Sequence, residues 1–192
     1  MPQEPSADST LESLLDAAIA CVEEFGLSGA TTRRIAQRAG VNEVTLFRRF
    51  GNKAALLRAV MQREAAQVEA DIAHHSGDLE EDLVRVVSAY IRLVTRRGRL
   101  LMVGISEMPR HPELQEALAG PARVVAGVLE LLTRYQREGQ LRPEPPAQTL
   151  MALIGPLLMS VFASGALPGT FSLPEPRAHV RAFLEGRRAA AS

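Results

Sequence analysis

The sequence predicts an all-α fold in which a three-helix N-terminal region precedes a larger helical region. No stretch of the 192 residues shows sustained period-two alternation bounded by turn residues, whereas several stretches place apolar residues at helical spacing. Hydrophobic residues make up 46% of the chain and charged residues 23%. This composition is ordinary for a soluble globular protein with one large or two small domains.

The first helix is predicted over residues 9–25. Ser9 and Glu12 form a capping-box pattern at its start, and Gly26 is expected to end it. Seven apolar residues share one face of this helix: Leu11, Leu14, Leu15, Ala18, Ile19, Val22 and Phe25. We expect the helix to pack across the two short helices that follow.

The run TTRRIAQRAGVNEVTLFRRF, residues 31–50, predicts two short helices joined by a tight turn. Gly40 can adopt the positive φ of the turn, and Ala36 is small enough to let the second helix approach. Asn42 is expected to cap the second helix by accepting a hydrogen bond from an unpaired backbone amide. The apolar contacts between the helices are assigned to Ile35, Ala39, Val41 and Leu46. This order of residue types is typical of a helix-turn-helix motif.

The rest of the chain is also predicted to be helical. A helix begins after Asn52, its expected cap, and runs to about residue 74. A break over residues 74–78 follows. Further helices are predicted over 79–97, 100–107, a short and a long segment of 112–138 divided at Gly120-Pro121, 147–165 and 176–188.

Basic charge is concentrated around the helix-turn-helix pattern. Residues 28–63 carry eight basic side chains against the single acid Glu43, a net charge of +7, whereas the whole chain has 22 bases and 22 acids. One basic segment in a neutral chain indicates a polyanionic partner at that segment. The charge could instead belong to a solvated helix face, but its coincidence with the two-helix pattern favours double-stranded DNA.

The helix at residues 147–165 is unusually apolar, since no charged residue occurs from Pro145 to Pro174. Its length raises the question of a membrane span. Interspersed glycine, proline and serine dilute the apolarity, and no Lys or Arg cluster flanks the segment. We therefore expect a helix buried on most sides and no membrane partner.

Small residues recur every four positions along this helix, at Ala152, Pro156, Ser160 and Ser164. Such a stripe lets another helix approach closely. We expect a homodimer formed through the helices at 147–165 and 176–188. In the last helix the contacts are assigned to Val180, Phe183 and Leu184.

Several function classes lack support in the sequence. Cys21 is the only cysteine, which excludes an intrachain disulfide and a cysteine-based zinc site. The four histidines lack metal-site spacing, and no nucleophile–base pair, phosphate loop or carboxylate pair stands out. We therefore assign no catalytic residue, metal or cofactor. The first ten residues lack the parts of a secretory signal, so a cytoplasmic location is expected.

The segment GATTRRIAQRAGVNEVTLFRRFGNKAALLRAV resembles the DNA-binding domain of the tetracycline-repressor (TetR) family of bacterial transcription regulators. The patterns T-T-x-x-I-A-x-x-A-G-V, L-F-x-x-F and N-K-x-x-L carry the resemblance, which covers residues 9 to about 60. It implies an N-terminal arm at 1–8, a helix-turn-helix DNA-binding domain at 9–55 and a helical regulatory, ligand-binding and dimerisation domain at 56–192.

The resemblance implies DNA contacts from Thr32, Arg33, Asn42, Glu43, Val44, Thr45, Phe47, Arg48, Arg49 and Lys53. Arg33 would donate two hydrogen bonds to a guanine edge. Asn42 and Val44 would lead the recognition helix with Glu43. Thr32, Thr45, Arg48, Arg49 and Lys53 would contact or lie along the phosphate backbone.

Two of these positions have open alternatives. Position 47 is commonly tyrosine in the family, and Phe47 has no hydroxyl for a phosphate, so its ring could equally pack between the helices. Glu43 could accept a hydrogen bond from a cytosine amino group or could stabilise the helix N-terminus electrostatically.

The second half of the chain implies, by the same resemblance, an effector pocket. The candidate lining residues are Tyr90, Met102, Ile105, Met108, Val125, Leu129, Met151, Met159 and Phe162. Each could equally be an ordinary core residue. The resulting expectation is a transcription regulator, a repressor released from a palindromic operator by a small apolar or amphipathic molecule. The alternatives are a helical-bundle enzyme and a DNA-packaging protein that uses the motif only for contact.

Overall fold

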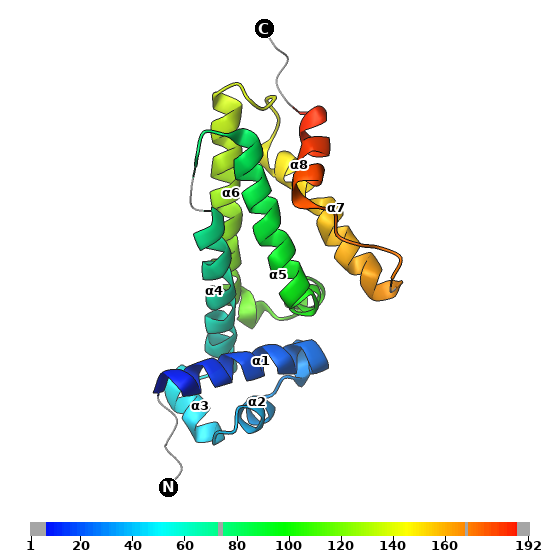
Figure 1. Ribbon diagram of the computed structural model, residues 1–192. Helices are drawn as coiled ribbons and strands as arrows, with labels where there is room; N and C mark the ends of the chain where they lie inside the picture. The colour runs from blue at the N-terminus through cyan, green and yellow to red at the C-terminus, as the bar shows by residue number, and fades with distance from the viewer. Residues whose placement is uncertain (1–6, 73–74, 168, 188–192) are drawn as a thin grey trace. The chain divides into compact units, whose positions relative to one another are not determined.

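The computed structural model describes residues 7–72, 75–167 and 169–187, and its regular elements are helices (Figure 1). The elements are α1 (Ala7–Gly29), α2 (Thr32–Arg38), α3 (Glu43–Phe50), α4 (Lys53–Ile72), α5 (Leu79–Glu107), the short 3-10 helices η1 (Met108–Arg110) and η2 (Pro112–Leu118), α6 (Ala119–Arg137), α7 (Pro146–Ala166) and α8 (Pro176–Glu185). The predicted all-α fold is confirmed. Most of the predicted N-terminal arm, residues 1–6, lies outside the described part of the chain.

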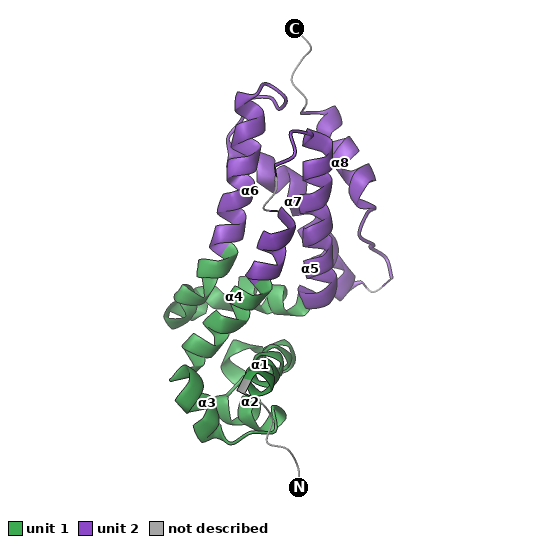
Figure 2. Cartoon of the chain, turned by 60° about the vertical axis from the view of Figure 1, so that its left-hand side comes forward, with its two compact units in different colours: residues 1–64, 99–121 green, residues 65–98, 122–192 purple. Residues whose placement is uncertain are grey.

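The chain divides into two compact units (Figure 2). The first comprises Met1–Glu64 and Arg99–Pro121, and the second comprises Ala65–Gly98 and Ala122–Ser192. The segment 99–121 therefore packs with the N-terminal helices, although the predicted domain boundary lies near residue 55. The functional division at 9–55 and 56–192 stays a prediction.

The first unit is built around α1. Leu14, Ala18 and Val22 are completely buried on one face of that helix and pack with Ile35 of α2 and Leu46 of α3. The segment 99–121 contributes Leu100, Met108 and Leu114 to the same core. Because each fully buried aliphatic side chain stabilises the fold by about 1.5–3 kcal/mol, this shared core holds the short helices α2 and α3 in place.

The second unit has its own core, formed by α5, α6, α7 and α8. Tyr135 of α6 is fully buried, and its hydroxyl donates a 2.6 Å hydrogen bond to the buried carboxylate of Asp82 on α5. Val180, Phe183 and Leu184 of α8 are also buried in this core. Our assignment of those three residues to a dimer contact was therefore wrong, because the unit's own helices cover them.

Three helix boundaries differ from the prediction. Helix α1 begins at Ala7, so Ser9 lies inside it and does not cap it; the helix continues past Gly26, whose φ of 71° and ψ of 178° break its regularity. The predicted helices at 79–97 and 100–107 form the single element α5, kinked at Arg97. The short and long helices predicted within 112–138 are confirmed as η2 and α6, but they divide after Leu118 and not at Gly120-Pro121. Pro121 lies in the first turn of α6, where a missing N–H breaks no intrahelical bond.

Candidate DNA-binding interface

The turn between α2 and α3 is formed as the sequence predicts. Gly40 has a φ of 71°, and the Asn42 side chain accepts a 2.9 Å hydrogen bond from the Val44 amide at the start of α3. Ile35, Ala36 and Leu46 are buried between the helices. The predicted scaffold and N-cap of the helix-turn-helix are confirmed.

The predicted DNA contacts divide into exposed and partly buried positions. Val44 is 70% exposed and Phe47 is 46% exposed, so the Phe47 ring is not packed away between the helices. The side chains of Arg33, Asn42, Arg48 and Arg49 are exposed as well. The partly buried positions are Thr32, Glu43, Thr45 and Lys53.

Thr32 and Glu43 are bound to each other. The Thr32 hydroxyl donates a 2.6 Å hydrogen bond to the Glu43 carboxylate, which joins the first residues of α2 and α3. Glu43 also lies in the first turn of α3, where its negative charge interacts favourably with the positive end of the helix dipole. In this structure, Glu43 therefore has a structural role between the two helices.

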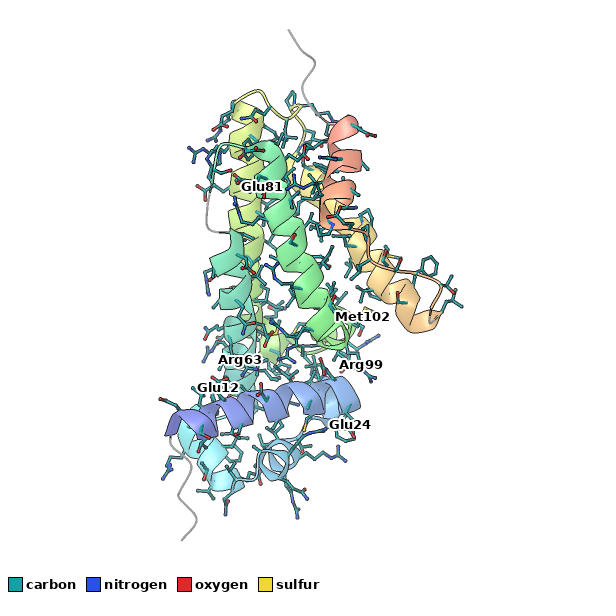
Figure 3. All side chains as sticks on the ribbon, viewed as in Figure 1. Glu12, Glu24, Arg63, Glu81, Arg99 and Met102 are labelled. Carbon is teal, nitrogen blue, oxygen red and sulfur yellow. The ribbon has the colours of Figure 1, made fainter. Side chains whose placement is uncertain are left out.

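The eight basic residues of the 28–63 segment are not equally available to a ligand. Arg38 and Arg58 form ion pairs with Glu24 and Glu116, and Arg63 on α4 pairs with Glu12 on α1 (Figure 3). The guanidinium of Arg34 donates a 2.7 Å hydrogen bond to a backbone carbonyl and stacks over a phenylalanine ring. Exposed ion pairs are weak, but they still compete with phosphate for the same guanidinium groups.

Three arginines of this segment have no hydrogen bond or ion pair within the described part of the chain. They are Arg33 on α2 and Arg48 and Arg49 on α3, and all three are exposed. Two of the three therefore lie on the helix that the resemblance assigns to DNA recognition. These arginines form the part of the basic segment that is open to a polyanion.

Lys53, the first residue of α4, has a different environment. Its ammonium donates a hydrogen bond to the backbone carbonyl of Leu27. Burial lowers the pKa of Lys53, and the nearby carboxylates of Glu113 and Glu107 partly oppose this shift. The ammonium group that was predicted to contact a phosphate thus donates to an acceptor within the protein.

The nine predicted pocket residues are divided between the two units, and their assignment to an effector pocket stays a prediction. Met102, Ile105 and Met108 belong to the first unit, where Met108 is a core residue, whereas the other six belong to the second. Four of the nine are strongly exposed in the single chain: Ile105, Val125, Met151 and Met159. Burial raises the pKa of Tyr90 to about 12, consistent with a position beside the second core.

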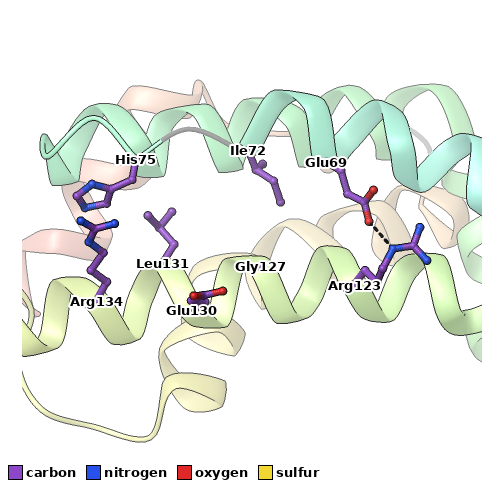
Figure 4. A pocket seen from close by; sticks show the side chains of 8 residues that line it. All are labelled: Glu69, Ile72, His75, Arg123, Gly127, Glu130, Leu131 and Arg134. Carbon is purple, nitrogen blue, oxygen red and sulfur yellow. Dashed lines mark hydrogen bonds and ion pairs between the residues drawn. The ribbon is translucent and has the colours of Figure 1, made fainter.

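A cavity of about 420 Å³ lies between α4 and α6 in the second unit (Figure 4). Its apolar middle is formed by Ile72 and Leu131, opposite the bare backbone of Gly127. His75 and Arg134 lie at one end, and an ion pair between Glu69 and Arg123 lies at the other: Arg123 Nε is 3.1 Å from the carboxylate. The cavity was not predictable from sequence patterns because its residues come from helices about 54 positions apart, as in the Arg123–Glu69 pair.

Fold and site together define a helix-turn-helix DNA-binding protein. A family model described as "Bacterial regulatory proteins, tetR family" matches residues 14–60, and one described as "Tetracyclin repressor-like, C-terminal domain" matches residues 73–173. The chain belongs to the tetR family of bacterial transcription regulators. The prediction of a DNA-binding regulator that is not an enzyme is confirmed, because the family and the related proteins are transcription regulators.

Individual relatives agree with this assignment. The chain is 29% identical over 98 residues to the HTH-type transcriptional regulator YvkB of Bacillus subtilis, covering 51% of this chain and 52% of that protein. It is 25% identical to the HTH-type transcriptional repressor SCO4008 of Streptomyces coelicolor, covering 86% of this chain and 90% of that protein. The match to YvkB thus spans only about half of that relative's length.

The fold is shared with solved structures. A TetR-family transcription regulator from Marinobacter aquaeolei matches 95% of this chain and 97% of its own with a TM-score of 0.75 at 19% sequence identity.

Helix α7 contains a stretch, Pro146–Gly165, that is long and apolar enough to cross a membrane. One such helix is weak evidence for a span, and regulators of this family are soluble DNA-binding proteins.

Proposed function

We propose that this protein is a cytoplasmic repressor that binds a near-palindromic operator as a homodimer and leaves it when a small molecule binds. The observation that carries the proposal is that Arg33, Arg48 and Arg49 are exposed on the helix-turn-helix and have no partner among the residues that the structure describes. Unpaired guanidinium groups beside a recognition helix can contact phosphates and guanine edges with no internal bond to break.

We divide the predicted DNA contacts by their environment. Arg33, Asn42 and Val44 are exposed at the start of the two helices and are proposed to read base edges. Arg48, Arg49 and Thr45 are proposed to contact the backbone, with Phe47 in apolar contact beside them. Thr32 and Glu43 reach DNA only if their mutual hydrogen bond opens, so we propose that they mainly hold α2 against α3.

We propose that the dimer forms through α7, with α8 supporting it from behind. Met151 and Met159, 61% and 62% exposed, lie eight residues apart on one helix face with Gly155 between them. Only 17% of the apolar stretch is buried within the chain, so our expectation of a helix buried on most sides was wrong for the single chain. A second copy would cover this face without any exposed charge to desolvate.

We propose that the effector binds in the second unit, in the cavity between α4 and α6. Its volume of about 420 Å³ lies within the usual range for small-molecule sites. Its apolar middle and polar ends suit an amphipathic molecule. Gly127 provides a test, because a Cβ atom built there meets nothing within 4 Å. Gly127→Leu should fill the cavity and block effector release while operator binding is retained, and Gly127→Ala is the matched control.

The proposed function is tested by selecting the preferred duplex from random DNA with the full-length protein. We expect an inverted repeat that is bound by two protomers. Compounds are then screened for release of that duplex. A protein that enriches no sequence would support the DNA-packaging alternative, and enrichment of a non-repeated site would contradict the dimeric operator complex.

A further inference from the structure

Side chains from outside α1 form hydrogen bonds to its backbone on both sides of a break in the helix. Gly26 has a φ of 71° and a ψ of 178°, so the regular ladder of backbone hydrogen bonds is interrupted there. Carbonyls before such a break and amides after it need other partners. The chain between Gly26 and Thr31, the N-cap of α2, is the joint that connects α1 to the helix-turn-helix.

The end of α5 supplies partners on both sides of the break. The guanidinium of Arg99 donates a 2.9 Å hydrogen bond to the Glu23 carbonyl, which precedes the break. The carboxylate of Glu107 accepts a 2.8 Å hydrogen bond from the Leu27 amide, which follows it. Glu107 also lies so close that a Cβ atom at Gly26 would be 2.6 Å from its Oε1. The backbone conformation therefore favours glycine here, and a side chain at this position would displace the Glu107 carboxylate.

Leu27 is held at both of its backbone polar groups. Its N–H donates to Glu107, the last residue of α5, and its C=O accepts from Lys53, the first residue of α4. Its side chain is buried in the core of the first unit. Two oppositely charged side chains thus form hydrogen bonds to the backbone of one residue, four positions before the N-cap of α2.

We propose that Lys53 and Glu107 form a clasp on the backbone of Leu27 that positions the helix-turn-helix for DNA, and that Lys53 acts through this clasp and not as a phosphate contact. Both are positioning residues. The inference rests on the proposed operator binding, because positioning matters only if this motif reads DNA. It reverses the role that the family resemblance implies for Lys53.

Lys53 and Glu107 have opposite charges, so a positioning role can be distinguished from a long-range electrostatic effect of these charges on DNA binding. Removing the negative charge of Glu107 should by itself strengthen binding to a polyanion. Weaker binding without the Glu107 carboxylate would therefore indicate a geometric role. When a cation that contacts phosphate is removed, the logarithmic salt slope of binding becomes shallower by about 0.9 for each phosphate that is no longer neutralised. When a cation that only positions the motif is removed, the slope stays unchanged.

The test measures binding of the full-length protein to the selected duplex over a range of salt concentrations. Lys53→Met and Glu107→Met should each bind about tenfold more weakly, equivalent to about 1.4 kcal/mol, with the salt slope of the parent. Glu107→Gln keeps an acceptor for the Leu27 amide and should bind within about threefold of the parent. Glu113→Gln removes the other carboxylate near Lys53 without touching Leu27 and should bind at least as tightly as the parent.

Arg49→Met provides the comparison for a true phosphate contact, and its slope should become shallower. If Lys53→Met lowers the slope as Arg49→Met does, or if Glu107→Met binds like the parent, the clasp is overturned. Thermal unfolding of each variant identifies one that does not fold.

Hydrogen exchange of the Leu27 amide tests the clasp without DNA. The amide should exchange about tenfold faster in Glu107→Met than in the parent and should stay protected in Glu107→Gln. Unchanged exchange in Glu107→Met would overturn the clasp. If the parent binds no duplex selectively, the proposed function fails while this measurement still tests the clasp itself.

Discussion

The hydroxyl of Thr32 donates a 2.6 Å hydrogen bond to the carboxylate of Glu43, so the first turn of α2 is tied to the first turn of α3. The bond crosses the helix-turn-helix beside its exposed surface, where Arg33 and Val44 are the neighbouring residues in sequence. The geometry of the reading surface therefore depends on a polar contact as well as on the buried contacts of Ile35 and Leu46.

Thr32→Val removes this hydrogen bond and keeps the shape of the side chain. We expect the free energy of unfolding to fall by about 1 kcal/mol, because one charge-assisted bond in a partly exposed position is removed. Operator affinity should fall with it. Urea unfolding and a binding titration measure the two effects.

Thr45→Val is the matched control, since no side-chain hydrogen bond ties the half-buried Thr45 to the described part of the chain. It should leave unfolding unchanged and weaken only DNA binding. Equal stability of Thr32→Val and the parent would show that the Thr32–Glu43 bond does not support the motif.

The buried pair Tyr135–Asp82 predicts an acid dependence of stability. Burial alone would raise the pKa of Asp82, but hydrogen bonds from Ser76 and Tyr135 and the charge of Arg85 outweigh it and hold the pKa below the ordinary value of 3.8. Because the folded pKa is depressed, the stabilisation is complete above the unfolded pKa near 4 and is lost as the pH falls through the lower folded value.

Tyr135→Phe should lower the free energy of unfolding by about 1–3 kcal/mol at neutral pH, because a buried carboxylate loses a donor. The difference from the parent should shrink as the pH falls from about 4 through the lower folded pKa of Asp82, because the carboxylate becomes protonated. Urea unfolding at pH 7 and pH 3 measures both values. Tyr90→Phe is the control, because burial is the cause of its pKa shift and its hydroxyl has no hydrogen bond to the described part of the chain. A pH-independent difference would contradict this account.

Met159→Glu tests the proposed dimer surface on α7. A carboxylate buried without a partner costs several kcal/mol, so the dimer dissociation constant should rise by about 100-fold or more. Sedimentation equilibrium measures the change. Gln67→Glu places the same charge on an exposed position of α4 and should leave the dimer intact. A Met159→Glu protein that stays dimeric at the same concentration would exclude this face.

Local features of the motif were predictable from the sequence. Asn42 binds an amide two residues away and Gly40 adopts the φ that its turn requires, so both depend only on neighbouring residues. The exposed surface of α2 and α3 was predictable because apolar residues at helical spacing mark the inner face and leave the basic residues on the outer face.

Long-range partners were not predictable. Lys53 reaches Leu27, 26 positions earlier, and Leu27 reaches Glu107, 80 positions later, so no local pattern encodes the clasp. Periodicity also identified the apolar face of α8, yet it could not say that the face meets the chain's own α5 and α7 instead of a second copy. For the same reason, periodicity could not identify the residues that line the cavity between α4 and α6.

Arg33, Arg48 and Arg49 are proposed to be the basic residues with which this protein reads and holds DNA. The most direct measurement is the affinity of the parent, Arg33→Ala and Arg49→Ala for the selected operator and its single-base variants over a range of salt concentrations. With Arg48 and Arg49 contacting phosphates in each of two protomers, the logarithmic salt slope of the parent should be about −3.6.

Arg33→Ala should lose about 1–3 kcal/mol of discrimination at one base pair of each half-site. Arg49→Ala should weaken all duplexes alike and make the slope shallower. Parent-like discrimination in Arg33→Ala together with a parent-like slope in Arg49→Ala would contradict the assignment of this surface to DNA.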